Sequence, residues 1–177
     1  MTCPARSEIA RDAILSPCGK YRYMLSRRWQ SGPACGFIML NPSTADASID
    51  DPTIRRCMGF ARREGCGGLI VVNLYAYRSS SPAVLAAVTD PHGGPDAERE
   101  FHAAVSRVDG PLIAAWGAWS AIRNPAAQIA KQYADRLMCL GRTKDGHPRH
   151  PLYVRADAPL QLFSPAFQPL PAPVGKA

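Results

Sequence analysis

The stretch that decides the fold is Phe37-Ile38-Met39-Leu40-Asn41-Pro42-Ser43-Thr44-Ala45-Asp46, in which an apolar run stops at a polar turn. The pattern predicts a buried strand over residues 35–40 that ends at this turn. Ligands of open parallel sheets bind outside the carboxyl ends of the strands. We therefore expect the turn to deliver four polar side chains to a binding site, namely Asn41, Ser43, Thr44 and Asp46.

Similar apolar runs recur at residues 69–73, 112–116 and 136–140. Stretches with helical character begin at Asp51 and also cover residues 82–88, 96–108 and 125–133. Apolar strands that alternate with helices are typical of parallel β-α-β units with helices on both faces of the sheet. The sequence thus predicts a three-layer α/β/α sandwich with a mostly parallel four-stranded central sheet. An N-terminal hairpin, with strands near 13–16 and 21–29, is expected in addition.

The length of 177 residues suits one domain. We expect this single domain over residues 1–177, with a core over 13–163 and a proline-rich tail over 164–177. The first fifteen residues carry charges and no apolar stretch, and no apolar run is long enough to span a bilayer. We therefore expect a cytoplasmic protein that does not bind membranes. None of the six cysteines forms a Cys-x-x-Cys pair, so no metal site is expected, although a metal or iron–sulfur cluster bound through long-range ligands is an alternative. No other cofactor is expected.

The formal net charge is +7, from 21 Lys and Arg residues against 14 Asp and Glu residues. An excess of positive charge favours a polyanionic partner, and the fork of the guanidinium group suits phosphate. A basic surface that is merely solvated is the alternative interpretation. Charge alone does not decide between the two.

Four motifs follow the expected strands in order, at residues 40–43, 71–78, 115–120 and 146–153. This ordered set resembles the uracil-DNA glycosylase superfamily over about residues 35–155, and its mismatch-specific branch in the first motif. Asn41-Pro42 is similar to that first motif, and Asn73 to the strand asparagine that reads the edge of the base. Trp116-Gly117 resembles the strand that ends in glycine, and His150-Pro151-Leu152 the late histidine motif.

The chain as a whole is more similar still to a bacterial and phage family, domain of unknown function 1643. The resemblance rests on four segments, which are Met39–Asp46, Asp51-Pro52-Thr53, Asn73-Leu74-Tyr75 and His150-Pro151-Leu152-Tyr153. The name of this family carries no function. The function expected below therefore comes from the glycosylase resemblance and from the chemistry of the residues.

The glycosylase resemblance implies hydrolysis of an N-glycosidic bond in DNA or another nucleic acid. This reaction builds positive charge on the sugar and negative charge on the departing base, which preorganised polar groups stabilise. Asn41 is expected to hold the attacking water and His150 to stabilise the base anion. Asp46 is a candidate general base, although an ion pair with Arg55 or Arg56 is an alternative role for it.

A base in a duplex must leave the stack before it reaches an active site, and it then stacks on an aromatic ring. Asn73 offers both a donor and an acceptor to the edge of such a base. The expected base-binding residues are Asn73, Tyr75, Tyr77, Ser43 and Thr44, and the expected phosphate-binding residues are Arg78 and Arg149.

Structural roles remain open for several of these residues. Asn41 and Asn73 are each also suited to hydrogen bonds with loop backbone. Asp50 and Asp51 are suited to capping a helix. Trp116 is suited to packing in the core. The first motif has Asn41 where the most efficient glycosylases have aspartate, and Ser43 where glycine is usual. A modified base, a free nucleotide or RNA is therefore an alternative substrate. A non-catalytic protein that binds nucleic acid or a nucleotide in the same pocket is the alternative function.

Overall fold

The computed structural model describes residues 8–43, 48–118 and 125–164. In chain order the elements are β1 (Ala10–Leu15), β2 (Arg22–Arg28), β3 (Ala34–Met39), α1 (Pro52–Arg63), β4 (Gly68–Asn73), η1 (Pro82–Ala86), α2 (Asp96–Ser106), β5 (Leu112–Ala114), α3 (Ala126–Gln132), β6 (Leu137–Cys139), η2 (Pro151–Tyr153) and β7 (Gln161–Leu162), where η denotes a short 3-10 helix. The predicted α/β class is confirmed. The helix expected over residues 82–88 is the 3-10 turn η1. Within the described ranges, every helix is too short or too polar to span a membrane.

The strands form one seven-stranded sheet in the order β1-β2-β4-β3-β5-β6-β7. Neighbours among β4, β3, β5 and β6 are parallel, whereas β1 pairs with β2, β2 with β4, and β6 with β7 in antiparallel fashion. The sheet is therefore larger than the four-stranded sheet expected from the sequence. The N-terminal hairpin is an integral part of it, and β7 adds a strand at the opposite edge. β7 has only two residues, both exposed, so it leaves no apolar run in the sequence.

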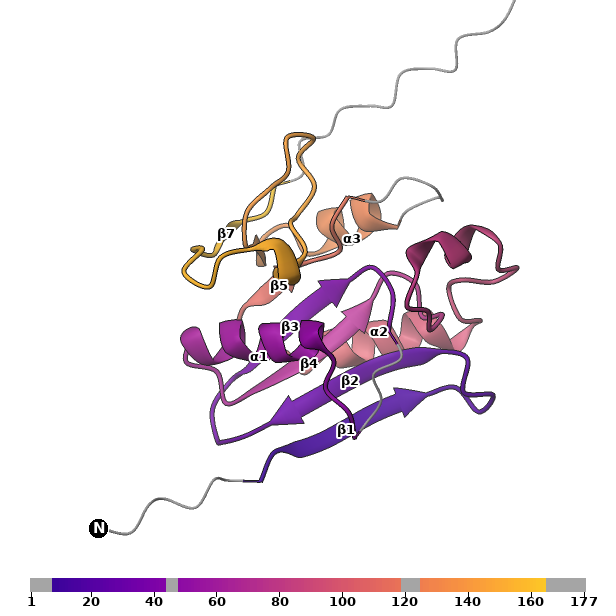
Figure 1. Cartoon of the computed structure of the whole chain (residues 1–177), viewed down its shortest axis with the longest axis horizontal. Helices are drawn as coiled ribbons and strands as arrows, with labels where there is room; N and C mark the ends of the chain where they lie inside the picture. Colours follow the sequence, from indigo (N-terminus) through magenta and orange to yellow (C-terminus); the bar gives the residue numbers. More distant parts are fainter. Residues whose placement is uncertain (1–7, 44–47, 119–124, 165–177) are drawn as a thin grey trace, which may run out of the picture.

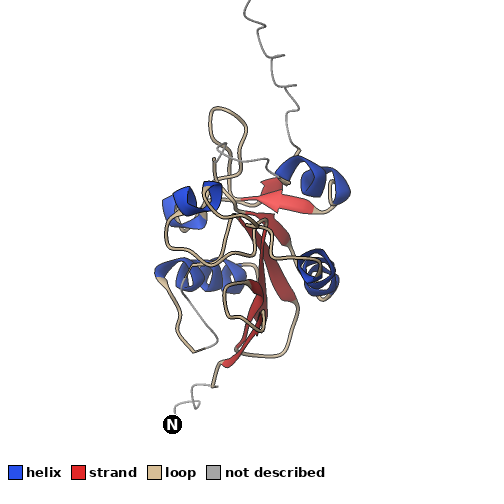
Figure 2. Cartoon of the chain, turned by 90° about the vertical axis from the view of Figure 1, so that its right-hand side faces the viewer, coloured by secondary structure: helices blue, strands red, loops and turns tan. Residues whose placement is uncertain are grey.

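Helices cover both faces of this sheet (Figure 2). β3 is buried at every position, and its side chains alternate between two apolar cores. Phe37 and Met39 pack in the core that includes Ile54 of α1. Ile38 packs in the core on the other face, which includes Phe101 of α2. Burial on both faces explains why this strand is a continuous apolar run rather than an alternating one.

The start of α1 follows the pattern expected at Asp51-Pro52. The Asp51 side chain accepts a hydrogen bond of 2.7 Å from the Ile54 amide and caps the helix, while Pro52 occupies the first turn. Asp50 has a different role, because its carboxylate accepts a 2.7 Å hydrogen bond from the buried guanidinium of Arg27. Asp50 and Asp51, directly before α1, are thus bonded to β2 and to the helix, respectively.

The connections around β3 place a crevice at one edge of the sheet. From β3 the chain crosses through α1 on one face to β4, and from β4 it crosses through α2 on the opposite face to β5 (Figure 1). β4 and β5 flank β3 on opposite sides, so the direction of winding reverses there. Where winding reverses, the segments that leave the carboxyl ends of neighbouring strands diverge and open a crevice.

Candidate active site

A pocket of about 660 Å³ occupies this crevice. Its walls come from the segments that follow β3, β4 and β5, from the start of α1 and from residues 143–153. We name it the strand-end pocket. Of the residues expected from the sequence, it brings together Asn41, Ser43, Asn73, Arg149 and His150.

Asn41 follows β3, and its carboxamide is fixed by backbone. Nδ2 donates to the carbonyl oxygens of Pro42, at 3.1 Å, and Ser79, at 2.9 Å. Because both partners are acceptors, the network assigns the nitrogen to this side and leaves Oδ1 as the free acceptor. No described residue donates to Oδ1. Asn41 therefore ties together the segments that follow β3 and β4 while it keeps one acceptor for a ligand or a water.

Ser43 lies two residues further on and contacts the cap of α1. Its hydroxyl donates to Oδ2 of Asp51, whose Oδ1 accepts from the Ile54 amide. Asp51 is the only carboxylate among the described residues that line the strand-end pocket. Both of its oxygens are thus engaged in hydrogen bonds that hold the turn and the helix.

Asn73 ends β4 at the level of Met39, which ends β3. Its side chain is half-buried and lines the pocket, and no described residue forms a hydrogen bond with its carboxamide. A half-buried amide retains its full capacity to donate and accept, and burial without a partner costs free energy. Asn73 is therefore well suited to recognise a ligand that offers both a donor and an acceptor.

His150 precedes η2 and serves as its N-cap. Nδ1 accepts a hydrogen bond of 3.4 Å from the Leu152 amide, so the neutral ring carries its proton on Nε2. Burial lowers the pKa of His150 below its ordinary value of 6.5, and the negative charge of Asp51 opposes this only in part. No described residue is bonded to Nε2. At neutral pH the imidazole is therefore a neutral donor for a ligand.

Gly117 and Arg56 both lie next to the segment around His150. Gly117, which follows β5, has a φ of 74°, and a Cβ at this position would lie 3.7 Å from the Cβ of His150. The positive φ requires glycine at this point. From α1, Arg56 donates through Nη2 to the Val154 carbonyl and through Nε, at 3.4 Å, to that of Pro151. η2 is thus attached to α1 at both of its ends.

Three of the expected residues lie outside the strand-end pocket. Tyr75 is fully buried, and its ring packs 5.0 Å from that of His92. Tyr77 packs against Tyr21, with 5.8 Å between ring centroids, and Arg78 donates to the Gly19 carbonyl at 3.2 Å. Beyond β4 the chain turns towards the hairpin of β1 and β2, which carries these side chains away from the pocket. The expected residues Thr44 and Asp46 lie outside the described residues.

The structure adds residues to the pocket that sequence reasoning did not select. Arg22 of β2 is 2% exposed and lines the pocket, as do Lys144 and the strongly exposed Tyr153 at its mouth. A charged residue inside the apolar segment 21–25 was a signal for Arg22, and Tyr153 belongs to the quoted histidine motif. The described ionised residues that line the pocket are Arg22, Lys144, Arg149 and Asp51, and together they carry an excess of positive charge.

In the described part of the chain, no group of three or more His, Cys, Asp and Glu side chains is placed to hold a metal ion. The described lining instead offers an acceptor at Asn41, an amide at Asn73, a neutral donor at His150 and several cations. This set can bind a planar polar group that is attached to an anion.

A family model described as "Protein of unknown function (DUF1643)" matches residues 22–152. The chain belongs to this family. The membership expected from the sequence is thereby confirmed, and the matched span contains Asn41, Asn73 and His150. Searches of curated proteins and of solved structures gave no match.

In this DUF1643 chain, we expect replacement of Arg56 by Gln to loosen η2. The change removes charge-assisted hydrogen bonds to two carbonyls and the stacking of the guanidinium over Phe60, at 4.9 Å. The free energy of unfolding should fall by about 1–3 kcal/mol, as measured by urea denaturation. Arg62→Gln is the matched control, because Arg62 lies on the same helix but stacks over Trp29. An equal effect of both changes would contradict a specific attachment of η2.

The lowered pKa of His150 predicts a pH dependence of stability. In the unfolded DUF1643 chain this group binds a proton near pH 6.5, whereas in the folded chain it does so only at lower pH. The unfolded state therefore binds more protons between these two values, so stability falls as pH decreases from 6.5 to the folded-state pKa. We expect this part of the slope to disappear in His150→Gln when unfolding is measured across the window. Parallel curves for the two proteins would contradict the prediction.

Proposed function

We propose that this protein processes nucleic-acid bases and hydrolyses the N-glycosidic bond of a base bound in the strand-end pocket. The observation that carries the proposal is the convergence of Asn41, Asn73 and His150, which come from three distant parts of the chain, on one pocket. Asn41 Oδ1 accepts a hydrogen bond from the attacking water. Asn73 bonds the edge of the base, and Nε2–H of His150 donates to the base as negative charge develops on it.

The cations at the pocket support an anionic substrate. Lys144 and Arg149 are exposed, line the pocket and are suited to the phosphates that flank a base. The role of stacking on the base is assigned to Tyr153, because Tyr75 and Tyr77 lie outside the pocket. It is 79% exposed at the pocket, and its ring lies 5.8 Å from that of His150.

We also propose that the fold is related to that of uracil-DNA glycosylases. The support is the order of the motifs at residues 40–43, 71–78, 115–120 and 146–153, and the parallel core of β4, β3, β5 and β6 that carries the first three. The hairpin of β1 and β2 and the strand β7 extend this core on both sides.

The proposal is tested by incubation of the purified protein with single- and double-stranded DNA and RNA that carry uracil, mismatched or modified bases. Abasic products are detected by strand cleavage in alkali for DNA and in aniline for RNA. We expect products on at least one substrate, and their loss in His150→Ala. His147→Ala is the matched control, because His147 is in the same segment but does not line the pocket. Absence of abasic product on every substrate, beside an active reference glycosylase, would reject the catalytic proposal.

A non-catalytic binding protein is the second candidate, and one observation favours it. Both carboxylate oxygens of Asp51 are already engaged, so the described lining holds no free carboxylate to activate water. In that case His150→Ala weakens binding of a nucleic acid, and no variant shows turnover. An enzyme that acts on a free nucleotide is distinguished by salt, because binding to a nucleic-acid backbone weakens steeply as salt is added.

A further inference from the structure

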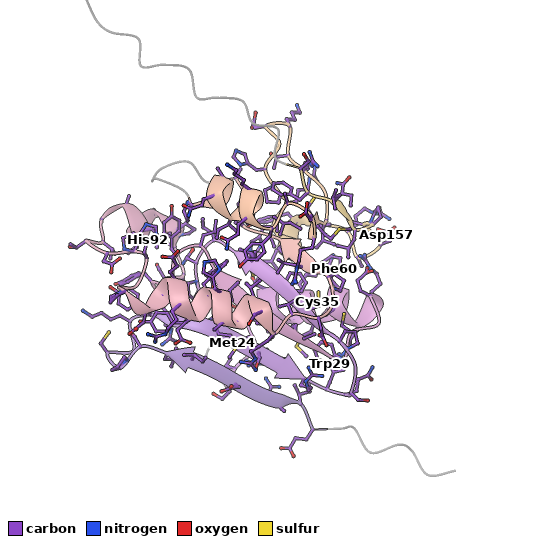
Figure 3. The ribbon with its side chains drawn as sticks, turned by 180° about the vertical axis from the view of Figure 1, so that it is seen from behind. Met24, Trp29, Cys35, Phe60, His92 and Asp157 are labelled. Atoms are coloured by element: carbon purple, nitrogen blue, oxygen red, sulfur yellow. The ribbon has the colours of Figure 1, made fainter. Side chains whose placement is uncertain are left out.

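A second pocket, of about 330 Å³, lies on the side of the sheet that α2 and α3 cover. Figure 3 shows this side from the front, with α2 across the sheet and His92 labelled. Residues from β2, from the end of β4, from the segment before α2 and from both helices line it. We name it the helix-side pocket. Its volume is at the lower end of the range found for small-molecule sites, which suits a single ring system.

The charge of this pocket differs from that of the strand-end pocket. Apart from histidines, the described lining groups that are charged at neutral pH are Arg22 and Glu98, one of each sign. The described lining of the strand-end pocket has Arg22, Lys144 and Arg149 as cations and Asp51 as its one anion. A phosphate is therefore attracted to the strand-end pocket, whereas the helix-side pocket is matched to an uncharged ligand.

The lining of the helix-side pocket is that of a ring-binding site. Leu74, Phe101 and Ile129 provide buried apolar surface, and the carboxamides of Gln128 and Gln132 provide donors and acceptors near the opening. Apolar walls with a few polar groups that fix orientation are typical of sites for small ligands. Aromatic faces stack on heterocycles of any identity.

Two polar side chains that line the pocket, His102 and Tyr23, are already held in position. His102 forms a hydrogen bond of 2.7 Å through Nδ1 with the Tyr133 hydroxyl, and Tyr23 donates to the Gly93 carbonyl at 3.1 Å. Such bonds fix rings before a ligand arrives, which reduces the entropy lost on binding. The pocket is thus preformed in the described part of the chain.

From these observations we propose that the helix-side pocket binds a neutral nitrogen heterocycle, such as a nucleobase or a nucleoside without phosphate. It is a second site, distinct from the anion-binding strand-end pocket. Arg22 and Asn73 line both pockets and form the wall between them. The proposal does not depend on glycosidic bond hydrolysis, because it concerns binding alone.

The test measures binding of adenine, uracil, adenosine and uridine to the full-length protein by titration calorimetry and by NMR. We expect saturable binding of at least one probe, with little dependence on salt and with shifts of the side-chain amide signals of Gln128 and Gln132. Ala97→Trp, which places an indole in the pocket, should weaken binding at least about tenfold. Ala103→Trp is the matched control, since Ala103 is exposed on the same helix and outside both pockets.

Several results would overturn the proposal. One is the absence of saturable binding by all four probes. Another is binding that Lys144→Gln abolishes but Ala97→Trp preserves, because the probe would then occupy the strand-end pocket. If Ala97→Trp does not fold, the amide shifts in the unaltered protein decide, and saturable binding without shifts at Gln128 and Gln132 rejects the site. All of these outcomes can be measured even if the protein has no glycosylase activity.

Discussion

Replacement of His150 by Ala should reduce the rate of base release by about 10²–10³-fold, the usual effect of removing one preorganised donor from a developing anion. The reason is the fixed tautomer, in which the Leu152 amide bonds Nδ1 and leaves Nε2–H for the base. Single-turnover rates on the best substrate measure the loss, and binding of a non-cleavable substrate analogue should change far less. A rate within twofold of the unaltered protein would remove His150 from the mechanism.

The same tautomer predicts the pH profile of the reaction. Because burial lowers the pKa of His150 below 6.5, the neutral donor predominates at pH 7 and above, and the rate should vary little there on account of this group. Below pH 6.5 protonation of Nδ1 removes the acceptor for the Leu152 amide, and the rate should fall through the lowered pKa. A rate that rises on acidification through this range would indicate that the imidazolium is the active form.

Replacement of Asn41 by Asp should destabilise the protein and should not create a more active enzyme. Aspartate would bring another carboxylate to the pocket. Because the most efficient glycosylases have aspartate at the corresponding position, this change could be expected to raise activity. In this structure, however, Nδ2 of Asn41 donates to the Pro42 and Ser79 carbonyls. A carboxylate cannot donate and would face two carbonyl oxygens, so we expect a loss of about 2–4 kcal/mol in the free energy of unfolding.

The matched control for this change is Asn73→Asp. It makes the same chemical substitution in the same pocket, but no described residue bonds the Asn73 carboxamide. Its effect on urea denaturation should therefore be much smaller, while recognition of a ligand edge should suffer more. Equal losses of stability for the two variants would show that the bonds of Asn41 to the backbone contribute little.

A simple geometric rule decides which site residues could be placed from the sequence. Asn41 and Asn73 could be placed from sequence because the carboxyl ends of parallel neighbours meet at one edge of a sheet. Tyr75 could not, because its position depends on pairing after β4 ends, where its amide bonds the Leu40 carbonyl. The ring is thereby directed into the core, a consequence of a long-range contact that no local pattern reveals.

Arg22, in contrast, lines the pocket although the sequence did not predict it there. It stands at the start of β2, far in sequence from every motif, and reaches the pocket only because β2 runs antiparallel to β4. That pairing carries the first residue of β2 to the carboxyl end of β4, where the Arg22 amide bonds the Ala76 carbonyl. The sequence predicted the hairpin but not that β2 pairs with β4. Arg22 lines the pocket because of that pairing.

The attachment of η2 to α1 also bears on how function is lost. His150 belongs to a segment that pairs with none of the named strands and is held to α1 by Arg56, whereas Asn41 and Asn73 adjoin the centre of the sheet. Proteins open in parts, and segments with few ladder bonds open at lower free energy than central strands. Mild denaturant should therefore release residues 140–154 first, and amide exchange there should outpace that of β3. His150 would then leave its position in the pocket, and the proposed reaction would stop while the sheet remained folded.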